Sequence, residues 1–368
     1  MNVLLTCAGR RNYLVQCFRD VVGPEGRVLA ADTCAHAPAL RDADVAFILP
    51  PLGDPGYIDR LLAVCRDERV GLLIPLNDFE LPLLAANLAR FLAIGTTPMI
   101  SSPAVIERCF DKWATFTFLR ANGIPTPQTY LTLDAARDAL VCGEVAFPLV
   151  LKPRWGSGSF GIEYVWAMDE LALVHALATR RYTRSIMPDR RMAAPDALIL
   201  IQERLPGAEH GLDIVNDLAG RYVCTLAKRK LMMRSGETDR AATTRHAGLE
   251  QLGAQLGGLL GHVGILDCDV FLHGDTCAVL EMNPRFGGGY PFSHAAGANV
   301  PAALVAWARG ETPNPAWLTI APCVTASKYD RVAVMEPHNA ATLDTWREGE
   351  DLIPATNPSC GRRSTRRR

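Results

Sequence analysis

The chain has 368 residues, which is too long for one ordinary domain and predicts two or three domains. It is 49% hydrophobic and 21% charged, a composition typical of globular rather than disordered proteins. With 38 Lys and Arg residues against 39 Asp and Glu residues, the net charge of −1 excludes a chain built throughout to bind nucleic acid.

Cysteine usage and the apolar segments indicate an intracellular protein. The eleven cysteines include no CxxC pair, so we expect reduced thiols rather than a zinc site or a disulfide framework. The first eight residues lack the basic and apolar regions of a signal peptide. The longest uncharged stretch, 287–308, contains glycines and prolines that break a helix, so we expect no membrane span. We therefore expect a cytoplasmic protein with no membrane partner.

The first hundred residues alternate short apolar runs with helical patterns. Strands are predicted at 3–6, 28–31, 45–49 and 72–74, and helices at 12–22 and 58–66. Strands that alternate with helices predict a parallel sheet covered on both faces.

This N-terminal region has two features of a dinucleotide site but lacks its glycine motif. Gly9 lies in the first turn and Asp32 ends the second strand, but the segment 7–12 has no other glycine of the GxGxxG motif. Arg10 and Arg11 stand where a pyrophosphate would need bare backbone. We therefore do not expect NAD binding.

Polar residues follow the strand at 72–74, where ligands of parallel sheets bind. Asn77, Asp78 and Glu80 are therefore candidates for the wall of a substrate cleft. The alternative is that Asn77 or Asp78 caps a helix.

After residue 100 the pattern changes to two helices followed by strands. Helices are predicted at 101–110 and 114–121, and the segment 179–196 is predicted to be a loop. Further strands are predicted at 148–152, 162–166, 198–202, 212–215, 221–227, 266–272 and 276–282.

Lysine is rare, with five residues against 33 arginines, so each lysine is a candidate for a compact phosphate-binding charge. Codon bias is the alternative. Lys152 ends an apolar strand and precedes a loop whose backbone N–H groups could approach an anion. The residues of this loop that we expect to bind a nucleotide are Gly156, Ser157, Gly158 and Ser159. The lysine precedes the glycines, so this is not a Walker loop, and a flexible hairpin is the alternative.

An oxygen-rich cluster is predicted on two strands near residue 280. Strand alternation places Glu281 and Asn283 on one face, and Asp269 lies on the preceding strand. Carboxylate and amide oxygens suit Mg²⁺. Arg285, just beyond, could face a developing negative charge. A solvated strand face is the alternative.

A third cluster follows the apolar strand near residue 200. The segment that begins at Gln202 has a backbone that could pair with an adenine edge, and Glu209 could reach ribose hydroxyls. An acidic turn is the alternative.

The order of these motifs over residues 1–330 resembles the ATP-grasp superfamily, and more narrowly its carbamoyl-phosphate-synthase-like, carboxylate–amine ligase branch. The shared elements are 111–112 before a helix, 123–127, 148–153, the glycine-rich loop, 202–209, and Asp269 with 281–285. The resemblance implies an α/β and α+β fold, with a Rossmann-like N-terminal domain before a two-lobed ATP-grasp domain. The implied divisions are the Rossmann-like domain at 1–105, a small lid lobe at 106–185, a large lobe with the metal site at 186–330, and a C-terminal strand with a basic, disordered tail at 331–368.

The resemblance also implies residue roles. Lys112 and Lys152 would hold ATP phosphates, Glu203 and the Leu205 backbone adenine, and Glu209 the ribose. Lys228 and Arg285 would be catalytic, although Lys230 could take the phosphate role of Lys228. The metal ligands would be Asp269, Glu281 and Asn283, holding two Mg²⁺ ions that Mn²⁺ could replace. Many relatives have Glu at the first of these positions, so Asp269 departs from the pattern.

Two further segments are candidates for substrate binding. The segment 234–240, with Arg234, Glu237 and Thr238, is predicted to be a polar loop that could close over a substrate, and a solvated connection is the alternative. Gly288 and Gly289 would bring backbone amides beside Arg285.

The resemblance implies an ATP-dependent carboxylate–amine ligase that forms an amide or peptide bond through an acyl phosphate, releasing ADP and phosphate. One alternative activates bicarbonate, as in carbamoyl phosphate synthesis. Another is an ATP-binding regulatory protein without catalysis. The expected partners are small carboxylates and amines, amino acids among them, with no nucleic acid. A homodimer is left open.

Overall fold

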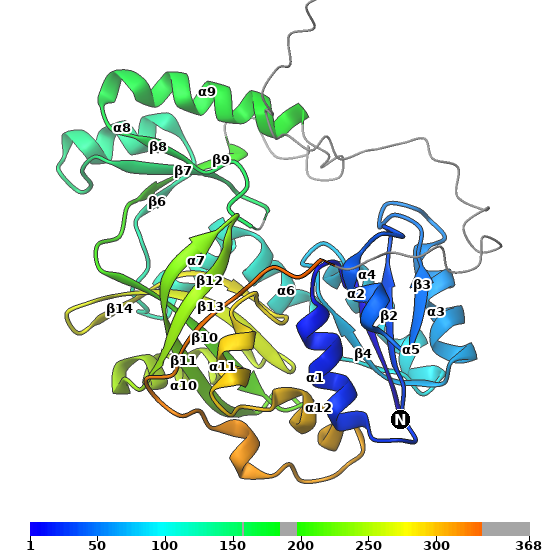
Figure 1. Ribbon diagram of the computed structural model, residues 1–368. Coiled ribbons are helices and arrows are strands. Elements are labelled where there is room, and N and C mark those ends of the chain that lie inside the picture. The colour runs from blue at the N-terminus through cyan, green and yellow to red at the C-terminus, as the bar shows by residue number, and fades with distance from the viewer. Residues whose placement is uncertain (157, 185–196, 333–368) are drawn as a thin grey trace, which may run out of the picture.

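The computed structural model describes residues 1–156, 158–184 and 197–332 (Figure 1). It contains a five-stranded, a four-stranded and a six-stranded sheet. The predicted fold class is confirmed, with a Rossmann-like domain followed by two lobes that each contain an antiparallel sheet.

The N-terminal domain is a parallel sheet with strand order β3-β2-β1-β4-β5. Its central strand β1 alternates between two cores, because Val3 and Leu5 pack on one face and Leu4 on the other, all fully buried. Both faces of the sheet are therefore covered, as predicted. The strands are β1 (Asn2–Thr6), β2 (Val28–Asp32), β3 (Val45–Ile48), β4 (Val70–Pro75) and β5 (Thr97–Pro98), and the helices α1 (Asn12–Val22), α2 (Pro38–Asp42), α3 (Tyr57–Asp67), α4 (Leu81–Ala86) and α5 (Leu88–Ala93).

Two helices connect this domain to the rest of the chain. In α6 (Pro103–Phe110), the Ser102 hydroxyl accepts from the backbone N–H of Val105, and proline occupies the first turn. In α7 (Lys112–Ala121), the Asp111 carboxylate caps the helix by accepting from the Trp113 N–H at 2.9 Å. Asp111 therefore fixes the point where α7 begins, and with it Lys112.

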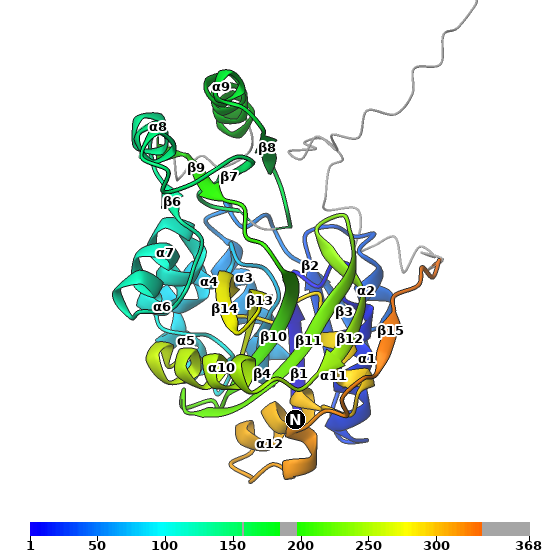
Figure 2. The ribbon, with the colours of Figure 1, turned by 90° about the vertical axis from the view of Figure 1, so that its left-hand side faces the viewer.

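The lid lobe is a four-stranded sheet with two helices on its outer face (Figure 2). Its strand order is β6-β9-β7-β8. The elements are β6 (Thr129–Tyr130), β7 (Leu149–Pro153), β8 (Glu163–Val165), β9 (Ile199–Glu203), α8 (Leu133–Val141) and α9 (Met168–Arg184). Because β9 pairs with β7 and β6, we propose a boundary between the lobes after Glu203, rather than at residue 185. The loop prediction at 179–196 is wrong for 179–184, which continue α9, while 185–196 lie outside the described residues.

The large lobe is a six-stranded antiparallel sheet with order β14-β13-β10-β11-β12-β15. Helix α10 covers one face, and α11 and α12 lie between the other face and α1 (Figure 1). The elements are β10 (Ala208–Asn216), β11 (Tyr222–Arg234), β12 (Glu237–Thr244), α10 (Ala247–Leu260), β13 (Ile265–His273), β14 (Thr276–Asn283), α11 (Tyr290–Ala295), α12 (Val300–Ala308), the 3-10 helix Pro315–Leu318, and β15 (Thr325–Ser327).

The N-terminal domain and the large lobe share one hydrophobic core. Phe18 of α1 meets Phe286 edge to face, with ring centroids 6.2 Å apart, and Val215 and Leu226 of the large-lobe sheet belong to the same cluster. This packing holds residues of the N-terminal domain beside the large-lobe sheet.

Two expectations concern membrane association and the C-terminus. None of the helices within the described ranges is long and apolar enough to cross a bilayer. The C-terminal strand and tail expected at 331–368 fall outside the described residues from position 333 onward.

Candidate active site

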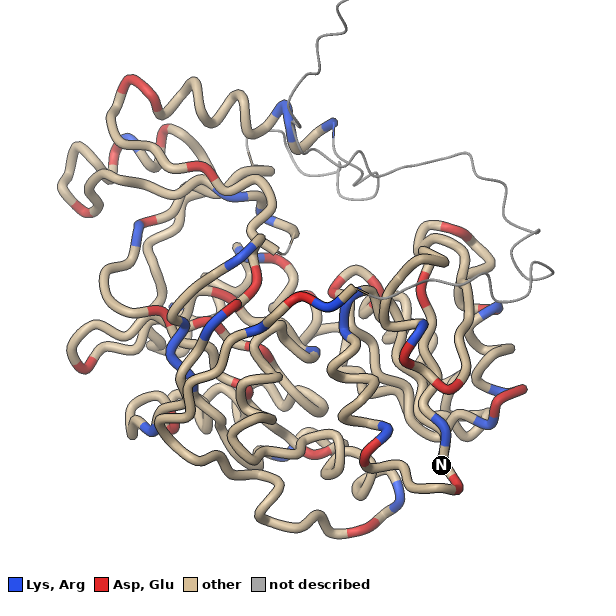
Figure 3. Tube along the Cα trace, in the orientation of Figure 1, with Lys and Arg blue, Asp and Glu red and all other residues tan. Residues whose placement is uncertain are grey.

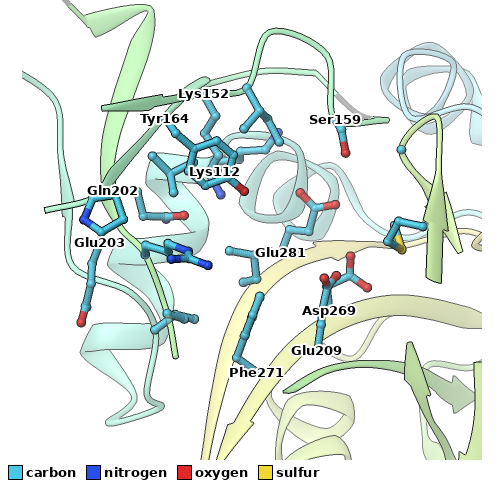
Figure 4. Close-up of a pocket in the computed structure, with 18 of the residues that line it drawn as sticks. Lys112, Lys152, Ser159, Tyr164, Gln202, Glu203, Glu209, Asp269, Phe271 and Glu281 are labelled. Carbon is cyan, nitrogen blue, oxygen red and sulfur yellow. The ribbon is translucent and has the colours of Figure 1, made fainter. Parts of the chain in front are cut away.

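A cavity of about 780 Å³ separates the lid sheet from the large-lobe sheet (Figure 4). The expected nucleotide-binding residues line it, apart from Ser157, which lies outside the described residues. Those that line it are Lys112, Lys152, Gly156, Gly158, Ser159, Gln202, Glu203, Leu205 and Glu209. The structure therefore brings together, around one cavity, three sequence clusters that span almost a hundred residues.

Two lysines enter this cavity from the lid side. Lys152 is only 4% exposed, and burial lowers its pKa to about 8, while Glu281 opposes that change. Within the described residues its Nζ forms no hydrogen bond or ion pair. Lys112 donates to the carbonyl of Gly156. A buried, unpaired ammonium in a cavity is a site for an anion.

Asp111 and Arg154 hold Lys112 in place. The Arg154 guanidinium donates to both carboxylate oxygens of Asp111, at 2.7 and 2.6 Å, and the Lys112 N–H donates to the Arg154 carbonyl. These contacts attach the first turn of α7 to the end of β7, where the glycine-rich loop begins.

The other end of the cavity has apolar walls. Glu203 is fixed by the Gln128 backbone, which donates to its carboxylate at 3.1 Å and accepts from its N–H at 2.8 Å. The Gln202 amide donates to Thr129 at 2.9 Å. The apolar side chains on the two sides, which the sequence reasoning missed, are Phe147, Val150, Ile162, Tyr164, Phe271 and Leu280. Apolar walls beside exposed strand backbone suit a flat heteroaromatic ring.

The expected metal ligands lie on two adjacent strands. Asp269 pairs directly with Glu281, and Asp267 with Asn283, so four oxygen-bearing side chains form a two-by-two patch. Sequence reasoning missed Asp267, although it precedes Asp269 by two positions and therefore shares its strand face. Figure 3 shows acidic and basic residues together in the large-lobe sheet, where β13 and β14 carry only acidic charges and β11 carries basic ones.

The donor chemistry of this patch fits a divalent cation. Burial raises the pKa of Asp269 to about 7, with Lys230 opposing the rise and Asp267 and Glu281 adding to it. For Glu281, by contrast, burial alone would raise the pKa, but the nearby cations Lys112, Lys152, Lys230 and Arg285 together outweigh it and lower the pKa. In the described part of the chain, no three His, Cys, Asp or Glu side chains could hold a metal ion by themselves. Mg²⁺ usually takes one or two protein carboxylates and completes its shell with phosphate and water, so Asp269 and Glu281 could hold it together with a bound nucleotide.

A second cavity of about 260 Å³ adjoins the first. The residues common to both are Gly158, Met233, Gly236, Asp269 and Glu281. The carboxylates of Asp269 and Glu281 therefore lie at the junction between the two cavities. Among the expected residues, those that line the second cavity are Lys228, Glu237, Thr238, Asn283, Arg285, Gly288 and Gly289.

Arg285 is buried between two carboxylates. It donates to Asp78 at 2.9 Å and to Asp267 at 3.2 Å, and these partners outweigh burial and raise its pKa. Asp78 belongs to the N-terminal domain and was expected to line the substrate cleft. It does not line the cavity itself but contacts Arg285, which does.

Lys228 and Lys230 have different partners. The Lys228 ammonium lies 2.6 Å from Asp213 and 3.3 Å from the Ser293 hydroxyl, beneath Gly289, and its side chain is 1% exposed. Lys230 lies 2.7 Å from both Glu209 and Asp269, the expected ribose and metal residues. Lys230 therefore contacts the residues expected at the ribose and the metal, whereas Lys228 contacts Asp213 and Ser293.

Three expected substrate residues lie away from both cavities. Asn77 accepts from the Phe79 N–H in a turn that precedes α4, and because the N-cap of α4 is Glu80, neither Asn77 nor Asp78 caps that helix as the alternative expected. Glu80 is buried, where Thr6 and Tyr57 donate to it at 2.8 and 2.6 Å. Arg234 forms ion pairs with Asp239 and Asp330.

The segment 234–240, expected to be a loop, instead forms the end of a β-hairpin. Arg234 pairs with Glu237 across the turn, because strands β11 and β12 continue to it. The hairpin tip touches the lid, since a Cβ at Gly236 would overlap the Gly158 carbonyl.

Sequence reasoning missed Arg11, which it treated only as an obstacle to pyrophosphate. Arg11 lines the second cavity and forms an ion pair with Glu237 at 2.8 Å. The signal was the pair Arg10–Arg11 at the carboxyl end of a parallel strand, where ligands bind.

Two family models match separate parts of the chain. Residues 3–100 match the family model "PylC-like, N-terminal domain", and residues 196–329 match "ATP-grasp in the biosynthetic pathway with Ter operon". The chain is 25% identical over 259 residues to the carbamoyl phosphate synthase large chain of Pseudomonas putida, a match that covers 65% of this chain and 22% of that protein. The chain thus spans about a fifth of the length of this relative.

Two solved structures illustrate the shared fold. Biotin carboxylase from Campylobacter jejuni, solved as a complex with an ATP compound, superposes with a TM-score of 0.68 at 14% identity, covering 87% of this chain and 73% of that one. L-amino acid ligase from Bacillus licheniformis superposes with a TM-score of 0.62 at 17% identity, covering 83% and 74%. At these identities the likeness establishes the fold alone.

Proposed function

We propose, from the premise that the chain belongs to the ATP-grasp superfamily, that it is an ATP-dependent ligase that joins a small carboxylate to an amine. The product is an amide or peptide bond, and ADP and phosphate are released. ATP occupies the larger cavity, and the two substrates occupy the smaller one.

The position of Asp269 and Glu281 at the junction of the two cavities supports this proposal most strongly. Lys112 and Lys152 lie in the larger cavity beside this junction and suit ATP phosphates. A γ-phosphoryl group at the junction would face a carboxylate in the smaller cavity. Bound Mg²⁺, held by Asp269, Glu281 and Asn283, would neutralise charge on the transferring phosphoryl group.

The chemistry requires positioning rather than a nucleophilic side chain. An oxygen of the substrate carboxylate attacks the γ-phosphorus as the bond to ADP breaks, which gives an acyl phosphate. The amine then attacks the acyl carbon, loses a proton, and displaces phosphate. Lys152, which has no carboxylate partner within the described residues, stabilises the phosphoryl charge, and Arg285 orients Asp267 and the carbonyl of Phe286. The lid and the hairpin tip at Gly236 limit access of water to the acyl phosphate.

The size of the smaller cavity favours an organic carboxylate over bicarbonate. At about 260 Å³ it is much larger than the roughly 30 Å³ that one water occupies in the liquid, and so exceeds the needs of a four-atom anion. It suits a small acid together with an amine, amino acids among them.

An ADP-release screen tests the proposal. The purified chain is incubated with MgATP and single carboxylates, then with each carboxylate paired with a mixture of amines. The proposal expects ADP release that requires both substrates, together with an amide product detected by mass spectrometry. Binding of MgATP without ADP release in any pair would support the regulatory alternative instead.

A further inference from the structure

The smaller cavity contains four cationic side chains, and three of them are neutralised by neighbouring carboxylates. Lys228 has Asp213, Lys230 has Glu209 and Asp269, and Arg285 has Asp78 and Asp267, all within 3.2 Å. These three cations therefore have little charge left for a substrate. The fourth, Arg11, is different.

Arg11 shares its carboxylate partner with another cation. Glu237 lies 2.8 Å from the Arg11 guanidinium and 3.0 Å from the Lys328 ammonium. Arg11, Lys328 and Glu237 together carry one net positive charge. The Arg11 end of the cavity thus keeps one positive charge that its own ion pairs do not neutralise.

The Arg11 guanidinium also has hydrogen-bond donors to spare. Only its Nη1 is engaged, by Glu237 and by the Tyr13 hydroxyl at 3.4 Å. Within the described residues, Nε and Nη2 of Arg11 donate to no other group. The side chain is 19% exposed, so these donors are mostly removed from bulk water. A guanidinium with two free donors matches a carboxylate.

The surroundings keep the guanidinium in position. The Tyr13 hydroxyl donates to the Gly287 carbonyl at 3.3 Å, which links the N-terminal domain to the glycine run. A Cβ at Gly288 would lie 3.4 Å from Arg11 Nη1 and 3.2 Å from Glu237 Cδ. The absence of a side chain at Gly288 therefore leaves room beside the ion pair.

We propose that Arg11 is a specificity-determining residue that binds a carboxylate of the substrate other than the one that is activated. The inference deepens the proposed function and rests on it. It assigns the substrate class: an amino acid whose α-carboxylate stays free, or a small dicarboxylate. One net charge suits a carboxylate monoanion better than a phosphate dianion.

Paired ligands with and without the second carboxylate test this assignment. The probes are amino acids against their α-amides and dicarboxylates against their monoamides, titrated calorimetrically in the presence of Mg²⁺ and a non-hydrolysable ATP analogue. For at least one pair, the wild type is expected to bind the acid at least tenfold more tightly than the amide. In Arg11→Met this preference disappears, because the acid weakens while the amide and the ATP analogue bind as before. Arg11→Lys, which keeps the charge without the planar fork, restores part of the preference.

Arg10→Met is the matched control, since Arg10 is an adjacent, exposed arginine whose ion pair with Asp330 is 3.8 Å long. It should retain the preference of the wild type. The inference is overturned if the wild type binds no acid of the panel, prefers the amides, or keeps its preference in Arg11→Met. The proposed function fails separately, if acids that bind through Arg11 give no ADP release with any amine.

Discussion

Asp269 and Glu281 lie directly opposite each other on strands β13 and β14, and both line the larger and the smaller cavity of the candidate active site. Two neighbouring carboxylates repel each other, and the lysine side chains around Asp269 and Glu281 offset that repulsion. Lys230 contacts Asp269, while Lys112 and Lys152 lower the pKa of Glu281 against the effect of burial. The pair is therefore placed where phosphoryl transfer between the cavities would need divalent cations.

Replacing Glu281 by Gln should lower turnover at least about a hundredfold, or about 2.7 kcal/mol of barrier. The change keeps the size of the side chain and removes one charge from the proposed metal site. Steady-state ADP release measures the effect, and circular dichroism checks the fold. Glu311→Gln, an exposed position after α12, serves as the control and should retain full turnover. Near-normal turnover of a folded Glu281→Gln protein would place the metal elsewhere.

Lys152 should give ATP binding a distinct pH dependence. Burial lowers its pKa to about 8, so the side chain is mostly charged at pH 7 and mostly neutral at pH 9. Phosphates favour the charged form, so the affinity for an ATP analogue should fall as the pH rises from 7 to 9, with proton uptake on binding at pH 8.5. Calorimetry in buffers of different ionisation enthalpy measures that uptake.

The Lys152→Met variant should bind the analogue weakly and lack this proton uptake. Lys152→Arg should recover part of the affinity, because a planar fork replaces a compact ammonium. Wild-type affinity and proton uptake in Lys152→Met would remove this lysine from the phosphate site.

Glu80 should make the fold less stable as the pH rises. Burial raises its pKa to about 7, although hydrogen bonds from Tyr57 and Thr6 oppose the rise. Between pH 4.5 and 7 the folded state binds a proton that the unfolded state has released, so the free energy of unfolding falls with increasing pH, by up to about 3 kcal/mol. Urea denaturation at pH 5 and 7.5 should show a smaller pH effect in Glu80→Gln than in the wild type. An identical pH effect in both proteins would show that Glu80 is ionised throughout this range.

Contact between the hairpin tip and the lid can be tested at Gly236. This residue has a φ of 77°, and an added Cβ would overlap the Gly158 carbonyl. Gly236→Ala should raise the KM for ATP severalfold, because the lid loop is pushed away. Gly274→Ala is the matched control: its φ of 57° imposes a comparable backbone cost, but nothing lies within 4 Å of the added atom. Equal KM values for the two variants would mean that the contact does not matter for ATP binding.

The strands, the expected metal ligands on β14 and the position of Lys152 could be predicted because each depends on local sequence. Alternation alone placed Glu281 and Asn283 on one face of β14, and the apolar run before Lys152 marked the end of β7. The loop prediction at 179–196 is wrong for 179–184 because arginines such as Arg181 and Arg184 suit the last turn of a helix as well as a loop.

The choice between Lys228 and Lys230 depends on contacts that the sequence does not contain. Lys228 and Lys230 are two positions apart on β11, so both side chains point to the same face of the sheet. Only the register of the neighbouring strands decides which residues each lysine contacts. Gly211 of β10 pairs with Lys228 on one side and with Asp269 on the other. Because Gly211 has no side chain, the side chains of Lys228 and Lys230 can extend over β10. The ion pair of Arg11 with Glu237 likewise joins residues more than two hundred positions apart.

Isotope transfer is the most direct test of the central claim that a substrate carboxylate attacks the γ-phosphate at the junction of the two cavities, where Asp269 and Glu281 lie. A substrate found in the ADP-release screen is prepared with ¹⁸O in both carboxylate oxygens and allowed to react in ordinary water. The account predicts that the released phosphate carries one ¹⁸O atom, because the attacking oxygen leaves with the phosphoryl group when the amine displaces it. Released phosphate without ¹⁸O would contradict the account, since the phosphoryl group would then have been transferred to water.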